Sequence, residues 1–386
     1  MFTSRRITTM GGDKFRDEFS LAFTTDDYIE TNFIPNYIHT NATMGMWVKF
    51  NTITEQTMGH HGSKRWYMGI NGSAKLFFGI ADAHTSGDSI DGGIVANKWF
   101  HFAVTAIDGT ATFYIDGVAK GTKSYTQNSS NNPDEGWFMG ARNNNGTAEN
   151  FMEAKISEVF QYDVGLTASQ VRTLYNGREP YNHKEGIASG NLKAWWRMGD
   201  GTLDKASLDR AGDDTGLICD EVNPTLGAEL VSNGDFDDET NYSDYNMEGD
   251  DTADLSTEQV LVGSNSLKID VNSSGEGTRL GGVATTTGKT YRISAWFYVT
   301  AGTAKINPGD GYWSPNALEP KTNVTNEWQQ LVMYNTADQN SSNAWIYLVA
   351  GSSNSVFYLD NVSVREVQGN PGIFLNSDNQ FSGDTP

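Results

Sequence analysis

Acidic side chains are the residues of this chain best able to do acid–base chemistry, and their densest run lies between Asp235 and Asp254. A retaining glycoside hydrolase needs two carboxyl groups held about 5–5.5 Å apart on rigid elements. The chain contains no Glu-x-Asp-x-x-Glu spacing, and the run at 235–254 has the composition of a turn. We therefore expect no catalytic residues and interpret this run as a solvated loop.

Other reactive side chains give no stronger sign of an active site. No Gly-x-Ser-x-Gly elbow is present, and the single cysteine, Cys219, has no neighbours that would activate a thiolate. His60 and His61 are adjacent, so on a strand their rings would point to opposite faces rather than to one metal. We expect both histidines in a loop that contacts a ligand or another subunit, and Cys219 as a small buried residue.

The best candidate for ligand contact is aromatic. Tyr312 and Trp313 lie in the Gly- and Pro-rich stretch GDGYWSP, where large rings are not easily buried. Exposed loop aromatics can stack on sugars, so these two residues are the predicted carbohydrate-binding platform, with anchoring of the loop against the core as the alternative. The remaining tryptophans of interest fall in strand patterns and are expected in the core: Trp47, Trp99, Trp296 and Trp328.

Composition narrows the class of protein. The net charge of −21 argues against nucleic-acid binding, which requires Lys and Arg patches. Acidic surfaces are compatible with divalent cations and keep a protein soluble. No run of about 18 apolar residues occurs, so we expect no membrane insertion. A lone cysteine forms no internal disulfide, which favours synthesis in a reducing cytoplasm, and the N-terminus lacks the apolar segment of a signal peptide.

The element pattern predicts an all-β chain. Asp108-Gly109 and Asp116-Gly117 separate alternating segments in WFHFAVTAIDGTATFYIDGVAKG, as expected for two consecutive tight hairpins. One helix is predicted from Leu166 onward, because Thr167 and Gln170 form a capping box before the apolar positions 171, 174 and 175. In KTYRISAWFYV, residues 291, 293, 295 and 297 should face one way and residues 292, 294, 296 and 298 the other.

These segments resemble the laminin-G and concanavalin-A-like domains. The resemblance rests on DDYIE, MGMWVKF, WFHFAVTA, FYIDG, FMGARN and AKISEVFQYDVGLTASQVRTLYNG, which occur in that family's order, and on LKAWWRMGDG as a terminal strand. It implies a concanavalin-A-like jelly roll over residues 18–225. Within it, Asp26 and Asp27 are a weaker candidate pair for calcium.

A second set of strands begins at Glu229 and resembles carbohydrate-binding modules of families 4 and 9. The matching pieces are ELVSNGDF, SNSLKIDV, KTYRISAWFYV, EWQQLVMY and VFYLDNVSVREV. This implies a galactose-binding-like jelly roll over residues 226–368. Such modules often hold a structural calcium between the first and last strands, and the resemblance places it at Asp235 and Asp360.

Both ends of the chain are expected to lie outside the sandwiches. Residues 1–17 carry Arg5, Arg6, Lys14 and Arg16, a basic cluster in an acidic chain, and are interpreted as an arm that docks on an acidic partner or as a disordered tail. Residues 369–386 are expected to form a flexible or partner-bound tail.

The combined pattern resembles virion structural proteins of tailed bacteriophages, such as fibre or decoration proteins. It implies a noncatalytic, homo-oligomeric protein of the virion, assembled in the host cytoplasm, whose partners are other virion proteins and host-surface polysaccharide. A bacterial surface adhesin or polysaccharide-binding module, located on the cell surface, is the alternative, and a glycan hydrolase is a third. Release of reducing sugar ends would favour the hydrolase.

Overall fold

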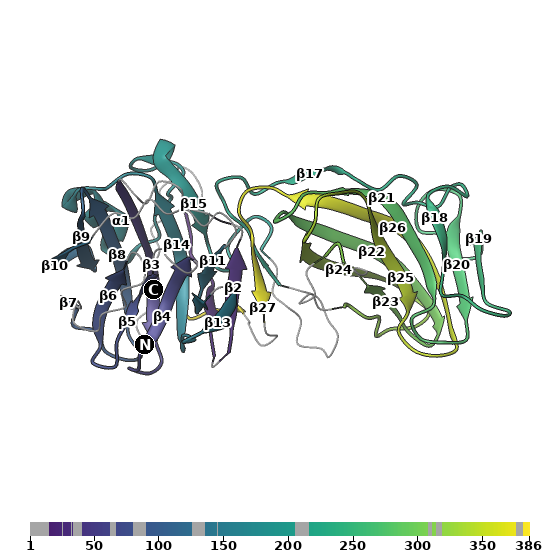
Figure 1. Cartoon of the computed structure of the whole chain (residues 1–386), viewed down its shortest axis with the longest axis horizontal. Helices are drawn as coiled ribbons and strands as arrows, with labels where there is room; N and C mark the ends of the chain where they lie inside the picture. The colour runs from purple at the N-terminus through teal and green to yellow at the C-terminus, as the bar shows by residue number, and fades with distance from the viewer. Residues whose placement is uncertain are drawn as a thin grey trace, which may run out of the picture.

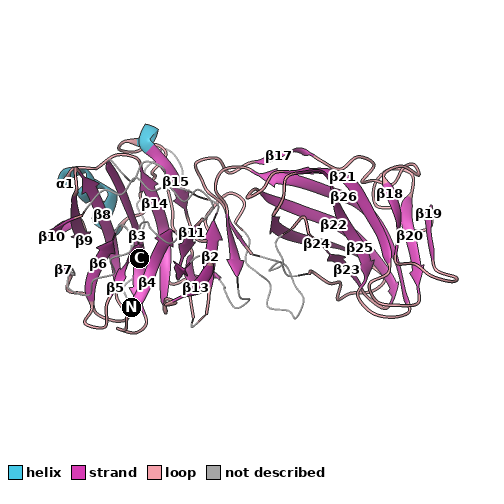
Figure 2. Cartoon of the chain, viewed as in Figure 1, coloured by secondary structure: helices cyan, strands magenta, loops and turns pink. Residues whose placement is uncertain are grey.

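The computed structural model describes residues 15–24, 26–31, 33, 41–61, 67–79, 90–125, 136–144, 146–204, 216–307, 311–313, 319–375 and 381–386. Two β-sandwiches lie end to end along the long axis of the molecule (Figure 1). Strands dominate both, and all helical segments among the described residues lie in the first (Figure 2). The expected all-β class, with two jelly-roll-like sandwiches, is thus observed. No helix in the described ranges is long and apolar enough to cross a membrane.

The first sandwich consists of two large sheets and a small hairpin. Sheet A has the order β10 (Val118–Ser124), β9 (Thr110–Ile115), β8 (Trp99–Ile107), β3 (Asn41–Phe50), β14 (Ala154–Tyr162), β1 (Ser20–Ala22) and β28 (Phe381–Ser382), with β15 (Leu192–Trp196) also paired to β14. Sheet B has the order β16 (Leu217–Ile218), β27 (Gly372–Leu375), β2 (Tyr28–Thr31), β11 (Trp137–Met139), β4 (Gln56–His61), β5 (Tyr67–Ile70), β6 (Lys75–Gly79) and β7 (Ile90–Asp91). The hairpin pairs β12 (Arg142–Asn144) with β13 (Thr147–Glu149).

The second sandwich consists of sheets D and E. Sheet D has the order β19 (Thr252–Ser256), β20 (Ser266–Val271), β26 (Ser355–Val367), β22 (Thr290–Ala301) and β24 (Trp328–Thr336), with β17 (Leu226–Glu229) also paired to β26. Sheet E has the order β18 (Tyr242–Tyr245), β21 (Gly277–Thr285), β25 (Ser341–Ala350) and β23 (Ala304–Asn307).

Local sequence explains the central hairpins of sheet A. Asp108 and Gly109 have φ angles of 47° and 79°, and Asp116 and Gly117 have 52° and 71°. Both central residues of each turn are therefore left-handed, which suits the twist of a two-residue hairpin. The register pairs Ile107 with Thr110 directly across the first turn. The predicted hairpins are confirmed.

The predicted helix is α1 (Ala168–Tyr175), and its capping box between Thr167 and Gln170 is formed on both sides. Val171 and Leu174 are buried on the outer face of sheet A, where they pack with aromatic side chains of β14 and β15. The helix ends one residue earlier than expected from Gly177, because Asn176 already adopts the left-handed cap. Two short 3₁₀ turns follow, η1 (Asn176–Arg178) and η2 (Ser189–Asn191).

The C-terminal segment is not a tail, which corrects the expectation for residues 369–386. Strand β27 pairs with β2 on one side and with β16 on the other, and β28 pairs with β1. Phe374 is buried in the core of the first sandwich. Beyond β28, Asp384 accepts bonds from Lys49 and Lys155 and from the indole of Trp99. The second sandwich is therefore inserted between β16 and β27 of the first.

Asp220 ties together the two segments that connect the sandwiches. Its Oδ1 accepts hydrogen bonds from the backbone N–H groups of Trp195 and Val222, each at 3.0 Å. Its Oδ2 accepts from the side-chain amide of Asn370 at 2.9 Å. The carboxylate is buried, so burial raises its pKa while these bonds oppose the shift. Cys219, next to it, is a buried free thiol, as expected.

The strand phase of β22 is confirmed. Residues 291, 293, 295 and 297 are in the core of the second sandwich. Trp296 and Tyr298 point the other way and are half-buried. Trp328 of β24 is also half-buried on that outer face, directly opposite Tyr298. The expectation of core positions for Trp296 and Trp328 is therefore wrong, whereas Trp47 and Trp99 are buried.

Candidate functional site

Trp313 lies in the core of the second sandwich and not on a loop surface. It is 2% exposed, its indole Nε1 donates to the carbonyl of Trp345 at 3.1 Å, and its ring meets Tyr291 edge-on at 5.5 Å. A ring buried in this way cannot stack on a sugar, which corrects its assignment as a platform. Tyr312 is half-buried and packs against the same core, so its role in ligand contact stays a prediction.

A different aromatic surface lies on the outer face of sheet E. On β25, Ala344, Ile346 and Leu348 point into the core, so the alternating residues Trp345 and Tyr347 point outward. Trp345 is half-buried, whereas Tyr347 is 5% exposed. This face carries the ring surface that the sequence suggested for the loop at 312–313.

Gly281 allows the Trp345 indole to lie against the sheet. A Cβ at this position would fall 2.5 Å from the indole, closer than real Cβ contacts. On β21, the guanidinium of Arg279 lies 4.4 Å from the centre of the Trp345 ring, and its Nε donates to the hydroxyl of Ser243 at 3.0 Å. The pair thus combines a flat apolar ring with a fixed cationic donor.

Arg279 belongs to a row of polar and aromatic side chains that crosses the strands β18, β21, β25 and β23 of sheet E. Ser243 pairs with Arg279, Arg279 with Tyr347, and Tyr347 with Asn307. The ring of Tyr245 packs on Tyr347 with centroids 4.2 Å apart. Carbohydrate recognition uses aromatic rings beside hydrogen-bonding side chains, and this face offers both on rigid strands. The sequence did not reveal this face, because NAWIYLV is apolar on both sides of the strand. Gly281 on the neighbouring strand, which leaves room for the Trp345 ring, is the signal that marks the outward side.

Asp235 lies near enough to Asp360 for its charge to act on that carboxyl, and a calcium site at the two acids stays a prediction. Asp360 is buried, and burial together with the charge of Asp235 raises its pKa. The Asp360 carboxylate accepts backbone N–H bonds from Leu261 at 2.7 Å, Val262 at 2.9 Å and Asn361 at 2.7 Å. In the described residues no three His, Cys, Asp or Glu side chains group as metal ligands. Further oxygen ligands for calcium would have to come from backbone carbonyls.

The histidine pair and the first-sandwich acids have structural surroundings. His60 and His61 are buried in β4 between β11 and β5, so the expectation of loop histidines is wrong. Asp27 is buried and accepts bonds from the N–H and the hydroxyl of Thr24 at 2.8 and 2.6 Å, which closes a turn. A calcium site at Asp26 and Asp27 stays a prediction.

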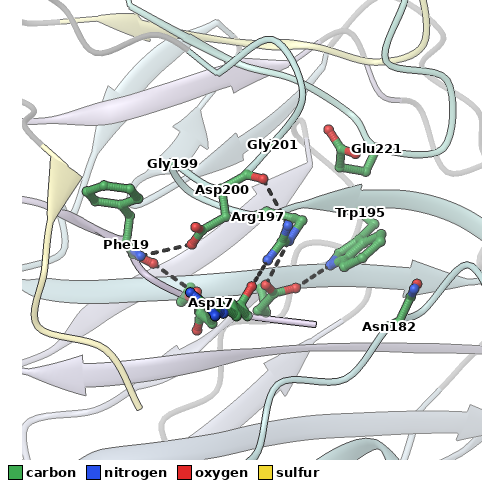
Figure 3. A network of polar contacts seen from close by, with 12 residues as sticks. Asp17, Phe19, Asn182, Trp195, Arg197, Gly199, Asp200, Gly201 and Glu221 are labelled. Atoms are coloured by element: carbon green, nitrogen blue, oxygen red, sulfur yellow. Dashed lines mark hydrogen bonds and ion pairs between the residues drawn. The ribbon is translucent and has the colours of Figure 1, made fainter. Parts of the chain in front are cut away.

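The segment Phe15–Phe19, which we call the N-terminal strap, is held against the first sandwich by a polar network (Figure 3). The Asp200 carboxylate accepts the backbone N–H groups of Glu18 and Phe19, both at 2.9 Å. The hydroxyl of Ser157 contacts both oxygens of Asp17 at 3.0 Å. Residues 15–17 are thus part of the sandwich, which corrects the boundary of the expected arm.

Arg197 is the cation of this network. Its guanidinium donates to the backbone carbonyl of Arg16, lies over the ring of Phe15 at 4.3 Å, and bonds Glu158 at 3.1 Å. Of the basic residues assigned to the arm, Arg16 is exposed and pairs with Glu18 at 3.3 Å. Arg5, Arg6 and Lys14 lie outside the described residues.

The network contains the carboxyl groups of Asp17, Glu158 and Asp200, and Arg197 forms its ion pair with Glu158. Burial raises the pKa of Glu158 to about 7, against the lowering effect of Arg197 and of the bond from the Trp195 indole. Burial, and then the charge of Glu158, raises the pKa of Asp17 to about 9. Because a raised acid pKa means that the folded state binds more protons, this contribution to stability is lost as pH rises through the folded pKa.

We therefore expect the first sandwich to lose stability as the pH rises from about 4, where these carboxyls ionise in the unfolded chain, to about 9, and Asp17→Asn to flatten that dependence. Asparagine keeps the shape of the protonated acid and has no charge to gain. Thermal melts from pH 4 to pH 10 measure the effect. Asp108→Asn, in an exposed hairpin turn that also suits asparagine, is the matched control and should leave the pH dependence unchanged. A steep fall that persists in Asp17→Asn would contradict the assignment.

A comparison with known families finds a match within the first sandwich. Residues 23–172 match the concanavalin A-like lectin/glucanase superfamily, in its laminin-G form. The matched stretch includes β2 through α1, which covers most of sheets A and B. We refer to this part as the lectin-like sandwich. A search of curated proteins finds no match.

Three solved structures are similar to parts of this chain at low identity. A Bacteroides ovatus protein proposed to bind carbohydrate is 16% identical over 54% of this chain and 56% of its own, with a TM-score of 0.41. The CBM22-1 xylan-binding domain of Paenibacillus barcinonensis Xyn10C is 18% identical over 38% of this chain and 96% of its own, with a TM-score of 0.28. Tailspike protein 4 of bacteriophage CBA120, in its enzymatically active domain, is 18% identical over 36% of this chain and 21% of its own, with a TM-score of 0.29. TM-scores this low carry no functional argument.

Proposed function

We propose that this chain is a noncatalytic glycan-binding protein and that the outer face of sheet E is its ligand site. The observation that carries the proposal is the flat seat of Trp345 on Gly281, with the Arg279 guanidinium held over the ring. A sugar ring would pack against the exposed part of this half-buried pair, with Arg279 and Asn307 placed in the same row to bond its hydroxyl groups. The lectin-like fold of the first sandwich supports a role in carbohydrate recognition.

The absence of turnover is supported by the surroundings of Asp17 and Glu158, two acids whose pKa is raised by burial. Glycosidases expose a carboxyl pair to the scissile bond. Glu158 is 2% exposed and already engages Arg197 and Trp195, while Asp17 is held by Ser157. These acids hold the strap in place and are not presented to a substrate.

Binding at one face is expected to be weak. Aromatic contacts contribute on the order of 1 kcal/mol beyond burial of their area. Display of many copies then raises the overall affinity by orders of magnitude. This agrees with a setting in which the protein is repeated on a particle.

A glycan array probed with the oligomerised full chain tests the function. We expect binding to at least one host-surface polysaccharide and no release of reducing ends. The lack of any bound glycan would contradict a binding role, and measurable hydrolysis would contradict the noncatalytic one.

The setting that we propose is the virion of a tailed bacteriophage, assembled in the host cytoplasm as a homo-oligomer with other virion proteins. Its support is the sequence resemblance and the strap, which fixes residues 15–19 on the lectin-like sandwich. Deletion of residues 1–14 should leave both sandwiches folded and prevent incorporation into particles. Normal incorporation of the truncated chain, seen by negative-stain imaging and gel analysis, would contradict this role.

Calcium at Asp235 and Asp360 is a further part of the proposal. The support is a buried carboxylate whose pKa is raised in part by a second acid, an arrangement that a cation would relieve. Free calcium at a concentration of 100 times its Kd adds about 2.7 kcal/mol to the stability of the folded state. The second sandwich should therefore melt higher in calcium than in EDTA.

Asp235→Asn is the informative variant for this test, because it spares the bonds of Asp360 to residues 261, 262 and 361. It should abolish the difference between calcium and EDTA without unfolding the sandwich. Identical melts of the unaltered protein in both solutions would leave Asp360 as an anchor of that loop alone.

A further inference from the structure

A second aromatic surface lies on the outer face of sheet D. Tyr298 of β22 is directly opposite Trp328 on β24 and Tyr358 on β26. Its ring meets theirs edge-on, with centroids 5.7 Å and 6.2 Å apart. Tyr298 and Trp328 are half-buried, whereas Tyr358 is 5% exposed.

Charged and polar groups complete this row. Lys268 of β20 is opposite Tyr358, with its ammonium 5.5 Å from the ring centre. The Glu258 carboxylate accepts bonds from Lys268 at 3.0 Å and from the Tyr358 hydroxyl. The acid and the base compensate each other, so the row is close to neutral in a chain of net charge −21. Lys268, Tyr358, Tyr298 and Trp328 form what we call the sheet D row.

The sheet D row begins where the contact between the sandwiches ends. Farther along β24, on the same face, Val332 and Tyr334 are buried in a cluster with Leu217 and Cys219 of the lectin-like sandwich. Trp296 of β22 lies between this cluster and the sheet D row. It is half-buried and pairs with the exposed Gln330 of β24. Aromatic side chains therefore continue across the sheet past the point where the first sandwich covers them.

We propose that the sheet D row is a second carbohydrate-binding surface and that it takes an uncharged glycan chain. The four strands span about 14 Å at the usual spacing, so an extended chain could contact several rings. The compensated Lys268–Glu258 pair offers hydrogen bonds without selecting for ligand charge. The proposal rests on the glycan-binding function given above, and it adds a site on the opposite layer of the same sandwich.

Two sites on opposite layers change what one molecule can do. Each site binds weakly, but a molecule with both can hold two glycan chains or two segments of one chain. Loss of either site should therefore lower the overall affinity for the polysaccharide by more than the affinity of that single site accounts for.

Affinity electrophoresis of the full chain in gels that contain a soluble uncharged polysaccharide bound on the array tests the inference. Trp345→Ala and Trp328→Ala should each reduce the apparent affinity measured by retardation by more than the about fivefold that one stacking contact contributes, and the double variant should migrate as in an empty gel. Val118→Ala, at an exposed apolar position on the lectin-like sandwich, is the control. Trp328→Thr, which keeps a strand-forming residue, separates loss of binding from loss of folding when melts are compared.

The outcomes distinguish the two proposals. Retardation lost in Trp345→Ala and unchanged in both Trp328 variants would overturn the sheet D row and leave the proposed function standing. The unaltered chain showing no retardation with any polysaccharide would overturn both. Retardation that survives in Trp345→Ala and disappears in the double variant supports the second site.

Discussion

Removal of residues 369–386 is expected to unfold the lectin-like sandwich, although the deletion lies after the second sandwich in the chain. The deletion removes β27 from between β16 and β2, and with it the buried ring of Phe374. Truncation of a buried Phe to Ala alone costs about 3–5 kcal/mol. Loss of three strand pairings, those of β27 with β2 and β16 and that of β28 with β1, adds to this, and the sum approaches the total stability of an ordinary domain, about 5–15 kcal/mol.

Scanning calorimetry provides the measurement, because the two sandwiches should give separate transitions. We expect the transition of the lectin-like sandwich to disappear in the truncated chain and that of the second sandwich to remain. Phe374→Ala should lower the same transition by several degrees, whereas Asp384→Asn, which weakens the half-buried ion pairs to Lys49 and Lys155, should lower it less. Two unchanged transitions after truncation would mean that β27 contributes little.

Trp345→Ala is the second change with a large expected effect, because it removes the ring on which the proposed site on sheet E is centred. Loss of stacking of about 1 kcal/mol should weaken monovalent binding at this face about fivefold. On an array of oligomers the loss multiplies over many contacts, so the signal attributable to this face should disappear.

Trp345→Phe is the matched control, since it keeps an apolar ring over Gly281 and should retain part of the affinity. Melting should change little in either variant, because the indole lies on the solvent side of the sheet. Unaltered binding by Trp345→Ala, with Arg279→Gln also silent, would move the ligand site away from sheet E.

Local features of the fold were predictable from sequence, and distant pairings were not. The Asp-Gly hairpins, the capping box at Thr167 and the alternation in β22 depend on neighbours a few residues apart, so the pattern alone predicts them. Strand β27 is four residues long and pairs with residues 28–31, more than 300 positions earlier. Nothing in GIFL identifies that partner, and the Asn370-Pro371 that precedes it is typical of a loop.

The candidate site shows the same limit. A Gly- and Pro-rich context predicted exposure for Trp313, but the Tyr291 ring and the Trp345 carbonyl hold its indole in the core. The outward position of Trp345 could not be predicted, because its strand is apolar on both sides. Which side of such a strand faces the core depends on the sheet that packs against it. The meeting of Asp235 and Asp360 was implied by resemblance alone, and the three backbone donors around Asp360 follow from tertiary structure.

The insertion of the second sandwich has a mechanical consequence. Because β1 pairs with β28, a pull applied between the two ends of the chain loads that pair and bypasses the second sandwich. A pull on a ligand held by the second sandwich is instead shared by the two connecting segments, which leave side by side and are tied at Asp220. Each segment then carries part of the load, and rupture requires both to yield. A tether of this kind suits an element that must stay attached under shear.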